Sequence, residues 1–186
     1  MTRRTATLLA GAACWLAATA VQATDATCLP DGSGYLSARV RGDLNLDIDW
    51  RGKGLACTGM PRPDGRGMRL RFAAKLPDGS ALAFVFAPPV LAEGATARAV
   101  PVNVTVLTEG GGRIYATRGG QRCTLDEVRQ QRLPDTADTD RAWAVTARGF
   151  CTGPARALVG DGDLLLTRFD FRGLVTFRDT VKDDKP

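Results

Sequence analysis

The stretch Asp43-Leu44-Asn45-Leu46-Asp47-Ile48-Asp49-Trp50 decides the fold class, because polar and apolar residues alternate in it without a break. Successive side chains of an extended strand point to opposite faces, so this alternation is typical of a half-buried strand. We therefore predict a β-strand whose four apolar side chains line a core. Its acidic and amide side chains then face water.

Other segments of the chain repeat this pattern, with turn residues between them. Pro77-Asp78-Gly79-Ser80 separates 68–76 from 81–87 and predicts a hairpin. Two further hairpins are predicted: one joins 100–107 to 113–117, and the other joins 164–171 to 174–177 across Arg172-Gly173. Pro101 predicts that the strand beginning at 100 starts at an edge or at an unpaired position.

One short helix is predicted over 125–132. Thr124-Leu125-Asp126-Glu127 has the form of a capping box, in which the hydroxyl and the carboxylate satisfy free amides at a helix start. Together, these patterns predict an all-β fold, an antiparallel sandwich of the jelly-roll or Ig-like kind, with about nine or ten strands and one short helix.

The first 23 residues have the layout of a secretory signal peptide. Arg3 and Arg4 precede an apolar run that ends in Val21-Gln22-Ala23, and the run is too short for a comfortable membrane span. The alternative is lipoprotein cleavage before Cys14, but the preceding residues lack the bulky aliphatic residue that usually opens such a site. We predict an exported single domain over 24–186 without a transmembrane segment, in which 179–186 form a frayed, charged tail.

Four cysteines remain after cleavage, and an even number in an exported protein predicts two disulfides. Four cysteines allow three pairings. We favour Cys28–Cys57 and Cys123–Cys151, because each would close a loop of about thirty residues within one half of the chain. Zinc is disfavoured because the chain has no Cys-x-x-Cys pair and no histidine.

The absence of histidine excludes several enzyme classes. Ser-His-Asp and Cys-His mechanisms and histidine-ligated metals all require that residue. No Gly-x-Ser-x-Gly elbow, phosphate loop or dinucleotide motif occurs in the sequence. The formal net charge falls from +5 to +3 when both signal arginines leave, and no basic tract of the kind that binds nucleic acid is present.

Carboxylates offer the remaining catalytic chemistry. Asp43, Asp47 and Asp49 would stand about 7 Å apart per two-residue step on one strand face, and this spacing suits the acid pair of a glycoside hydrolase. A solvated strand face explains the same residues at less cost.

Calcium is the metal that this set of side chains would favour. Asp43, Asn45 and Asp47 open like an EF-hand loop, but Ile48 and Gly54 replace its glycine and its bidentate glutamate, so that motif fails. The weak calcium candidates are loop carboxylates, and the same residues also suit hydrogen-bonded turns. They are Asp161 and Asp163, with Asp135 as a third.

A cationic surface is also predicted. Basic residues alternate along 69–75 and occur in the preceding loop, and arginine pairs well with sulfate, phosphate and carboxylate groups. The candidate anion-binding residues are Arg62, Arg66, Arg69, Arg71 and Lys75. The alternative is a solvent face that complements the acidic face of a neighbouring strand.

The sequence therefore favours a non-enzymatic binding or interaction module of the bacterial envelope, periplasmic or secreted. Its partner would be a protein or a surface glycan, and an inhibitor of a foreign hydrolase belongs to this class. No cofactor is implied. The alternative is a carboxylate-dependent glycoside hydrolase or a calcium-assisted carbohydrate-binding module.

Overall fold

The computed structural model describes residues 27–178, apart from 110–111, 118–121 and 135–139. This part of the chain is entirely β-structure, with twelve strands and no helix. The strands are β1 (Tyr35–Gly42), β2 (Leu46–Arg51), β3 (Ala56–Pro61), β4 (Met68–Lys75), β5 (Ala81–Ala87), β6 (Ala97–Pro101), β7 (Asn103–Glu109), β8 (Arg113–Ala116), β9 (Cys123–Arg132), β10 (Asp140–Cys151), β11 (Ala155–Ala157) and β12 (Asp163–Arg178).

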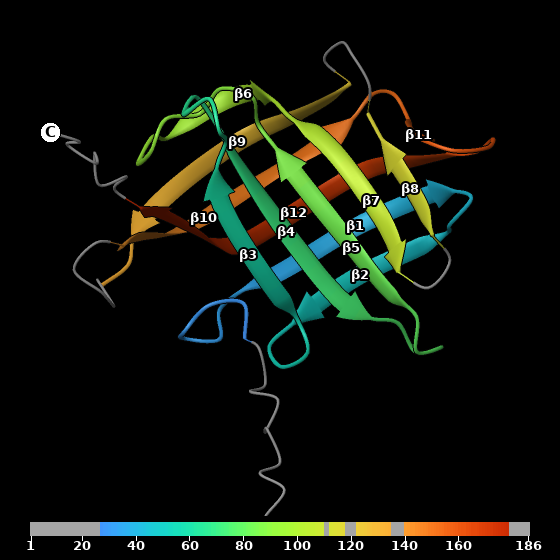
Figure 1. Cartoon of the computed structure of the whole chain (residues 1–186), viewed down its shortest axis with the longest axis horizontal. Helices are drawn as coiled ribbons and strands as arrows, with labels where there is room; N and C mark the ends of the chain where they lie inside the picture. Colours follow the sequence, from blue (N-terminus) through green and yellow to red (C-terminus); the bar gives the residue numbers. More distant parts are fainter. Residues whose placement is uncertain (1–26, 110–111, 118–121, 135–139, 179–186) are drawn as a thin grey trace, which may run out of the picture.

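The strands form one antiparallel sheet that folds over itself into two layers (Figure 1). The front layer has the order β3-β4-β5-β7-β8, and the back layer has the order β2-β1-β12-β10-β9-β6. The short strand β11 pairs with both β8 and β12 and so joins the layers along one side. The strands of the two layers cross in Figure 1, and the predicted antiparallel sandwich is confirmed.

The core lies between the layers and is centred on phenylalanine rings. Phe86 of β5 packs against Phe169 and Phe171 of β12, with ring centroids 4.8 and 4.7 Å apart. Phe72 of β4 lies 5.2 Å from Phe171. All four side chains are buried, so the interior is filled by contacts between the layers.

The opening stretch of the sequence packs as predicted on its apolar side. Its four apolar side chains contact the core: Leu44, Leu46, Ile48 and Trp50. Asp43 differs from the prediction, because its carboxylate accepts hydrogen bonds from Arg113 and from the Tyr115 hydroxyl, both at 3.0 Å. This acid therefore ties the β1–β2 connection to the front layer at β8.

Both predicted disulfides are present with the predicted pairing. Cys123 and Cys151 lie directly opposite each other on β9 and β10. Cys28 lies just before β1 and is bonded to Cys57 of β3, so this bridge links the back layer to the front layer.

The predicted helix over 125–132 is wrong, because these residues lie in β9 between β10 and β6. The pairing with β10 shifts at Asp126, where one extra residue forms a β-bulge. The bulge places Leu125 and Val128 on the same buried face although they are three residues apart. A spacing of three is typical of a helix, so the bulge imitates a helical pattern in the sequence.

The predicted turn at Arg172-Gly173 is also wrong, since β12 runs unbroken from Asp163 to Arg178. Gly173 lies in the middle of this strand, opposite Val145 of β10. A Cβ atom there would lie 2.5 Å from the Phe72 ring. The glycine therefore makes room for an aromatic side chain of the opposite layer and does not form a turn.

The hairpins of 68–76 with 81–87 and of 100–107 with 113–117 are confirmed as β4–β5 and β7–β8. The stretch beginning at 100 is divided, because Pro101 ends β6 and β7 begins at Asn103. β6 is the last strand of the back layer, where a proline without an N–H donor is tolerated.

The second side of the sandwich closes where β3 lies against β12 without pairing to it. Gly59 allows this approach, because a Cβ atom at that position would lie 2.3 Å from the carbonyl oxygen of Leu174.

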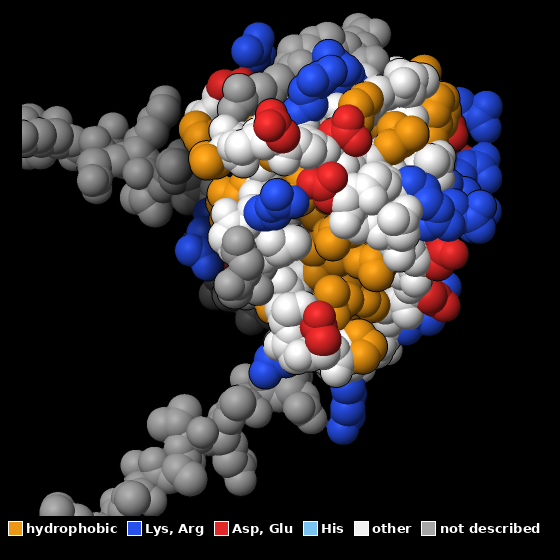
Figure 2. All heavy atoms as spheres, turned by 90° about the vertical axis from the view of Figure 1, so that its right-hand side faces the viewer, with side chains coloured by type: hydrophobic (Ala, Val, Ile, Leu, Met, Phe, Trp, Pro, Cys, Tyr) orange, Lys and Arg blue, Asp and Glu red, His pale blue; other side chains and the backbone are white. Residues whose placement is uncertain are grey.

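Hydrophobic side chains also reach the surface, and Figure 2 shows a strip of them among basic and acidic side chains on the side of β8 and β11.

No helix in the described part of the chain could span a membrane. The predicted signal peptide and the predicted tail over 179–186 both lie outside the described residues.

Candidate functional site

The outer face of the back layer carries a large group of charged side chains that lie close together. We call it the polar face and define it by the outward side chains of β2, β1, β12, β10, β9 and β6. Its charged members are Arg39, Arg41, Asp47, Asp49, Arg51, Arg98, Asp126, Glu127, Arg129, Arg148, Arg168, Asp170 and Arg172. Eight arginines against five acids give this face an excess of three positive charges, equal to the +3 expected for the whole mature chain.

The strand register arranges these side chains in rows across the sheet. One row runs through Arg51, Tyr35, Arg172, Thr146 and Arg129, one residue from each of five neighbouring strands. Adjacent strands lie about 4.8 Å apart, so the three arginines of this row recur about every 10 Å.

The neighbouring row alternates acids with other polar residues. It runs through Asp49, Ser37, Asp170, Arg148 and Glu127. Hydrogen-bond donors and acceptors therefore lie side by side across the whole width of the layer.

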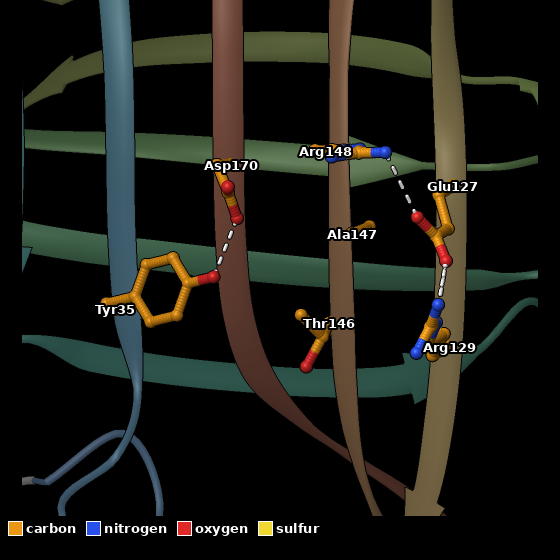
Figure 3. A pocket seen from close by; sticks show the side chains of 7 residues that line it. All are labelled: Tyr35, Glu127, Arg129, Thr146, Ala147, Arg148 and Asp170. Atoms are coloured by element: carbon orange, nitrogen blue, oxygen red, sulfur yellow. Dashed lines mark hydrogen bonds and ion pairs between the residues drawn. The ribbon is translucent and has the colours of Figure 1, made fainter.

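The middle of the polar face is hollowed into two adjoining recesses of about 250 and 560 Å³. Both are lined by Tyr35, Arg148 and Asp170. The smaller side chains of Ser37 and Thr146 lie between these longer side chains and leave the hollow open. Figure 3 shows the smaller recess, with strands of the front layer crossing behind it.

Tyr35 and Asp170 form the hydrogen bond at the centre of this site. The phenol donates to the carboxylate over 2.7 Å, and the Arg51 guanidinium lies 4.8 Å from the centre of the ring. Burial, together with the hydrogen bond to Asp170, raises the pKa of Tyr35 to about 12. The phenol is therefore protonated at neutral pH and acts as a donor.

Glu127 lies on the opposite side of the smaller recess between two arginines (Figure 3). Arg129 donates to it over 2.6 Å, and Arg148 forms an ion pair with it at 3.2 Å. The hydrogen bond from Arg129 lowers the pKa of this carboxyl group. Glu127 is thus an ionised acceptor that holds two arginines in place, and it is not suited to act as a general acid.

Among the described residues, two arginines of the polar face form no direct hydrogen bond or ion pair with an acidic side chain. Arg172 donates to the Ser33 and Thr146 hydroxyls, both over 3.1 Å, and to the Gln131 amide oxygen over 3.3 Å. These neutral oxygens fix the guanidinium, and the nearby acid Asp31 reaches it only through the Ser33 hydroxyl. The Arg168 side chain is exposed and has no hydrogen bond or ion pair with any residue that the structure describes.

The basic residues singled out in the sequence lie elsewhere. Arg69, Arg71 and Lys75 share the outer face of β4, in the front layer, where Thr58 and Met60 of β3 are the cross-strand neighbours of the two arginines. Neither neighbour is acidic. An anion site at these three residues stays a prediction.

The other two candidates of that group lie in the β3–β4 turn and are drawn to an acid. Arg62 and Arg66 both form ion pairs with Asp64, at 3.5 and 3.4 Å. The structure thus does not bring all five predicted anion-binding residues together.

The predicted acidic residues are also paired. Asp47 binds Arg41 and Arg39 at 2.9 and 3.2 Å, and the hydrogen bond from Arg41 lowers the pKa of its carboxyl group. Asp49 binds Arg51 at 2.8 Å. A hydrolase that relies on Asp43, Asp47 and Asp49 remains an untested prediction.

The weak calcium candidates Asp161 and Asp163 lie in and directly after the β11–β12 turn, and Asp135 lies outside the described residues. Within the ranges that the structure describes, no three acids, cysteines or histidines are grouped so that they could hold a metal ion. Calcium binding remains an untested prediction.

Sequence reasoning did not single out the residues at the centre of this site. Tyr35 lies more than one hundred residues before Arg148 and Asp170, and only the pairing of β1, β12 and β10 brings the three together. The available signal was the alternation of Arg168, Asp170 and Arg172 with buried residues, which predicts an exposed strand face but not its neighbours.

No family model, no curated protein and no solved structure matches this chain.

Proposed function

We propose that this protein is an exported, non-enzymatic binding module that holds an acidic glycan of the bacterial envelope on its polar face. The observation that carries the proposal is the arginine row of the back layer, in which neutral oxygens hold Arg172, together with the exposed Arg168 that lines an open recess. Arginine binds carboxylate and sulfate groups through paired hydrogen bonds. The two disulfides support export, since such bonds persist in oxidising compartments.

A glycan suits this surface better than a protein does. Sugar hydroxyls both donate and accept hydrogen bonds, and Asp170 and Glu127 offer acceptors next to arginine donors. Protein interfaces are usually anchored by desolvated aromatic or apolar side chains. Of the two aromatic residues that line these recesses, Phe169 is buried in the core, and the ring of the other, Tyr35, is covered by Arg51.

Binding is favoured over hydrolysis by the protonation states at the site. Glycoside hydrolysis needs a carboxylic acid with a raised pKa next to a second carboxylate. The pKa of Glu127 is lowered by Arg129, and Tyr35 is a phenol that stays protonated. The recesses are also open to solvent, which leaves room for a polymer to extend beyond them.

The test is affinity electrophoresis of the purified, oxidised protein in gels containing polygalacturonate, with neutral dextran as the comparison. We expect retardation in polygalacturonate only. Arg148→Gln combined with Arg168→Gln should weaken binding at least tenfold, since each charge-assisted hydrogen bond contributes about 1.5–3 kcal/mol.

The matched control is Arg69→Gln combined with Arg71→Gln, which removes two arginines from the front layer and should bind like the unchanged protein. The proposal is overturned if polygalacturonate does not retard the protein, or if dextran retards it equally. Loss of binding only in the control variant would move the site to β4.

A further inference from the structure

An apolar recess adjoins the polar face and lies on the same side of the back layer. Beyond Arg172, the outward side chains of β12 are Leu174 and Thr176, and Ala142 of β10 lies opposite Thr176. A cavity of about 390 Å³ opens here. It is lined by Pro30, Asp31, Leu133, Pro134, Asp140, Ala142, Leu174 and Thr176.

A second hollow, of about 520 Å³, continues from this recess toward β3. Leu174 and Thr176 line both hollows, so the two are contiguous. Met60 of β3 lines the second hollow and is 56% exposed. Hydrophobic side chains thus form a continuous surface that runs from Leu133 across β12 to β3, with no described segment covering it.

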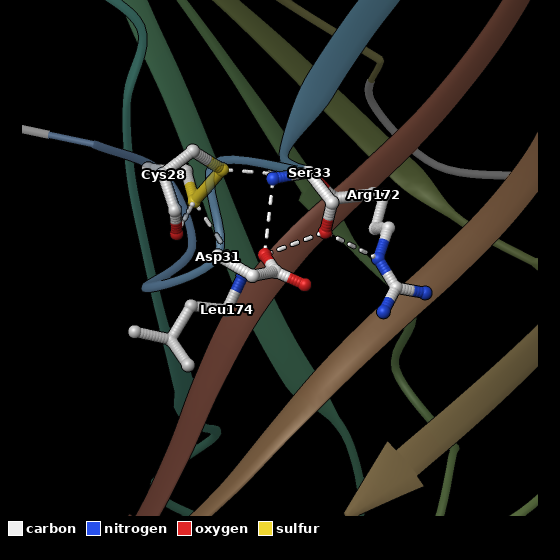
Figure 4. Close-up of a disulfide and its surroundings, with 6 residues drawn as sticks. Cys28, Asp31, Ser33, Arg172 and Leu174 are labelled. Atoms are coloured by element: carbon white, nitrogen blue, oxygen red, sulfur yellow. Dashed lines mark hydrogen bonds between the residues drawn. A yellow bond between two sulfur atoms is a disulfide. The ribbon is translucent and has the colours of Figure 1, made fainter. Parts of the chain in front are cut away.

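Arg172 is fixed at the boundary between this apolar surface and the polar face. It lies two residues before Leu174, about 7 Å away on the same face of the strand. Its Nε donates to the Ser33 hydroxyl, which in turn donates to Asp31 over 2.7 Å. Figure 4 shows Ser33 and Asp31 beside Arg172 and Leu174, so one turn both holds the arginine and forms a wall of the recess.

A fixed cation at the mouth of an apolar recess is complementary to an anionic amphiphile. The apolar part of such a ligand would leave water in the recess, and its charged group would meet Arg172 and the arginine row. We infer that the recess takes an acyl chain of an anionic envelope glycolipid whose sugar head lies on the polar face. The identity of the head rests on the proposed function, whereas the acyl site rests on the recess and Arg172.

An added peptide strand is less well supported at this place. β1 begins opposite Arg172, so the β12 edge beyond it has no strand partner on that side among the described residues. The Leu174 amide on this edge already donates to Cys57 Sγ over 3.5 Å, and the carbonyl of Leu174 lies against Gly59. The backbone groups that a peptide would need are therefore partly covered by β3.

The test is isothermal titration calorimetry with three probes: dodecyl phosphate below its critical micelle concentration, inorganic phosphate and dodecyl maltoside. The first probe has both chain and charge, and each of the others has one of them. We expect dodecyl phosphate to bind at least tenfold more tightly than either. Leu174→Ser and Arg172→Gln should each weaken that binding about tenfold.

Val159→Ser and Arg156→Gln are the matched controls, because both residues are exposed and lie outside the recess. Neither should change the affinity. Leu174 also packs against the core, so Ala142→Leu serves as a second variant. It fills the recess without removing a core contact and should also weaken dodecyl phosphate.

The inference is overturned if dodecyl phosphate binds no more tightly than inorganic phosphate, or if neither Leu174→Ser nor Ala142→Leu weakens it. If polygalacturonate still binds in that case, the proposed function stands without the acyl site. If dodecyl phosphate binds as expected while polygalacturonate does not, the acyl site stands and the acidic-glycan proposal fails.

Discussion

Replacing Gly59 with alanine should destabilise the protein by forcing β3 away from β12. The new Cβ would lie 2.3 Å from the Leu174 carbonyl oxygen and 2.6 Å from Val175 Cγ2. The carbonyl oxygen belongs to the backbone of a central strand, so β3 must move outward by about 1 Å to restore van der Waals contact. Overpacking of this kind costs about 1–3 kcal/mol, and we expect the upper end because backbone meets backbone.

The assay is urea unfolding of the oxidised protein, followed by tryptophan fluorescence. Gly153→Ala is the matched control, because its Cβ would meet only the flexible side chain of Arg122, with the nearest atom, a terminal guanidinium nitrogen, 3.0 Å away. That side chain can move, so the control should stay within about 0.5 kcal/mol of the unchanged protein. A Gly59→Ala variant as stable as its control would refute the close packing of β3 on β12.

Three further perturbations follow from the same structure. Replacing Cys28 and Cys57 by serine should lower the free energy of unfolding by about 3–4 kcal/mol, since the disulfide closes a loop between residues 29 positions apart. A decrease in that free energy of less than about 1 kcal/mol in urea unfolding would contradict this. Tyr35→Phe should abolish the phenolate absorbance change near pH 12. The stability that this phenol contributes is present below pH 10 and lost as the pH rises through 12. An absorbance titration that the substitution leaves unchanged would oppose the raised pKa of Tyr35. Glu93 accepts hydrogen bonds from Arg141 and Trp143, and the Arg141 hydrogen bond lowers its pKa, so its contribution is present above about pH 5 and lost on acidification. Glu93→Gln should therefore be less stable than the unchanged protein at pH 7 in thermal melts. The two should converge as the pH falls through the lowered pKa of Glu93, and a difference that stays constant with pH would be inconsistent with this carboxylate.

Strands with one solvent-exposed face could be predicted from the sequence. Burial of the other face leaves an alternation of polar and apolar residues, which is visible over a few consecutive positions. The two errors arose where tertiary contacts decide the local pattern. The bulge at Asp126 brings Leu125 and Val128 to one face and so imitates a helix. Gly173 looked like a turn residue, but it is a glycine because Phe72 of the other layer occupies the space of its side chain.

The candidate site could not be predicted in the same way. Arg168 and Asp170 alternate with apolar residues in the predicted strand 164–171, whereas Arg172 was assigned to a turn. The neighbours of all three depend on the register of β1 and β10, which sequence spacing does not contain. The basic cluster at 62–75 was conspicuous because its members are close in sequence. The polar face is built from side chains that are distant in sequence and close in space.

The most direct measurement is a titration of ¹⁵N-labelled, oxidised protein with oligogalacturonates, followed by amide chemical shifts in two-dimensional NMR spectra. The account predicts that the largest shifts occur in β1, β12, β10 and β9, around Tyr35, Arg148 and Asp170, while amides around Arg69 and Arg71 of β4 stay unchanged. Shifts confined to β4, or no shifts at ligand concentrations that retard the protein in gels, would contradict binding at the polar face.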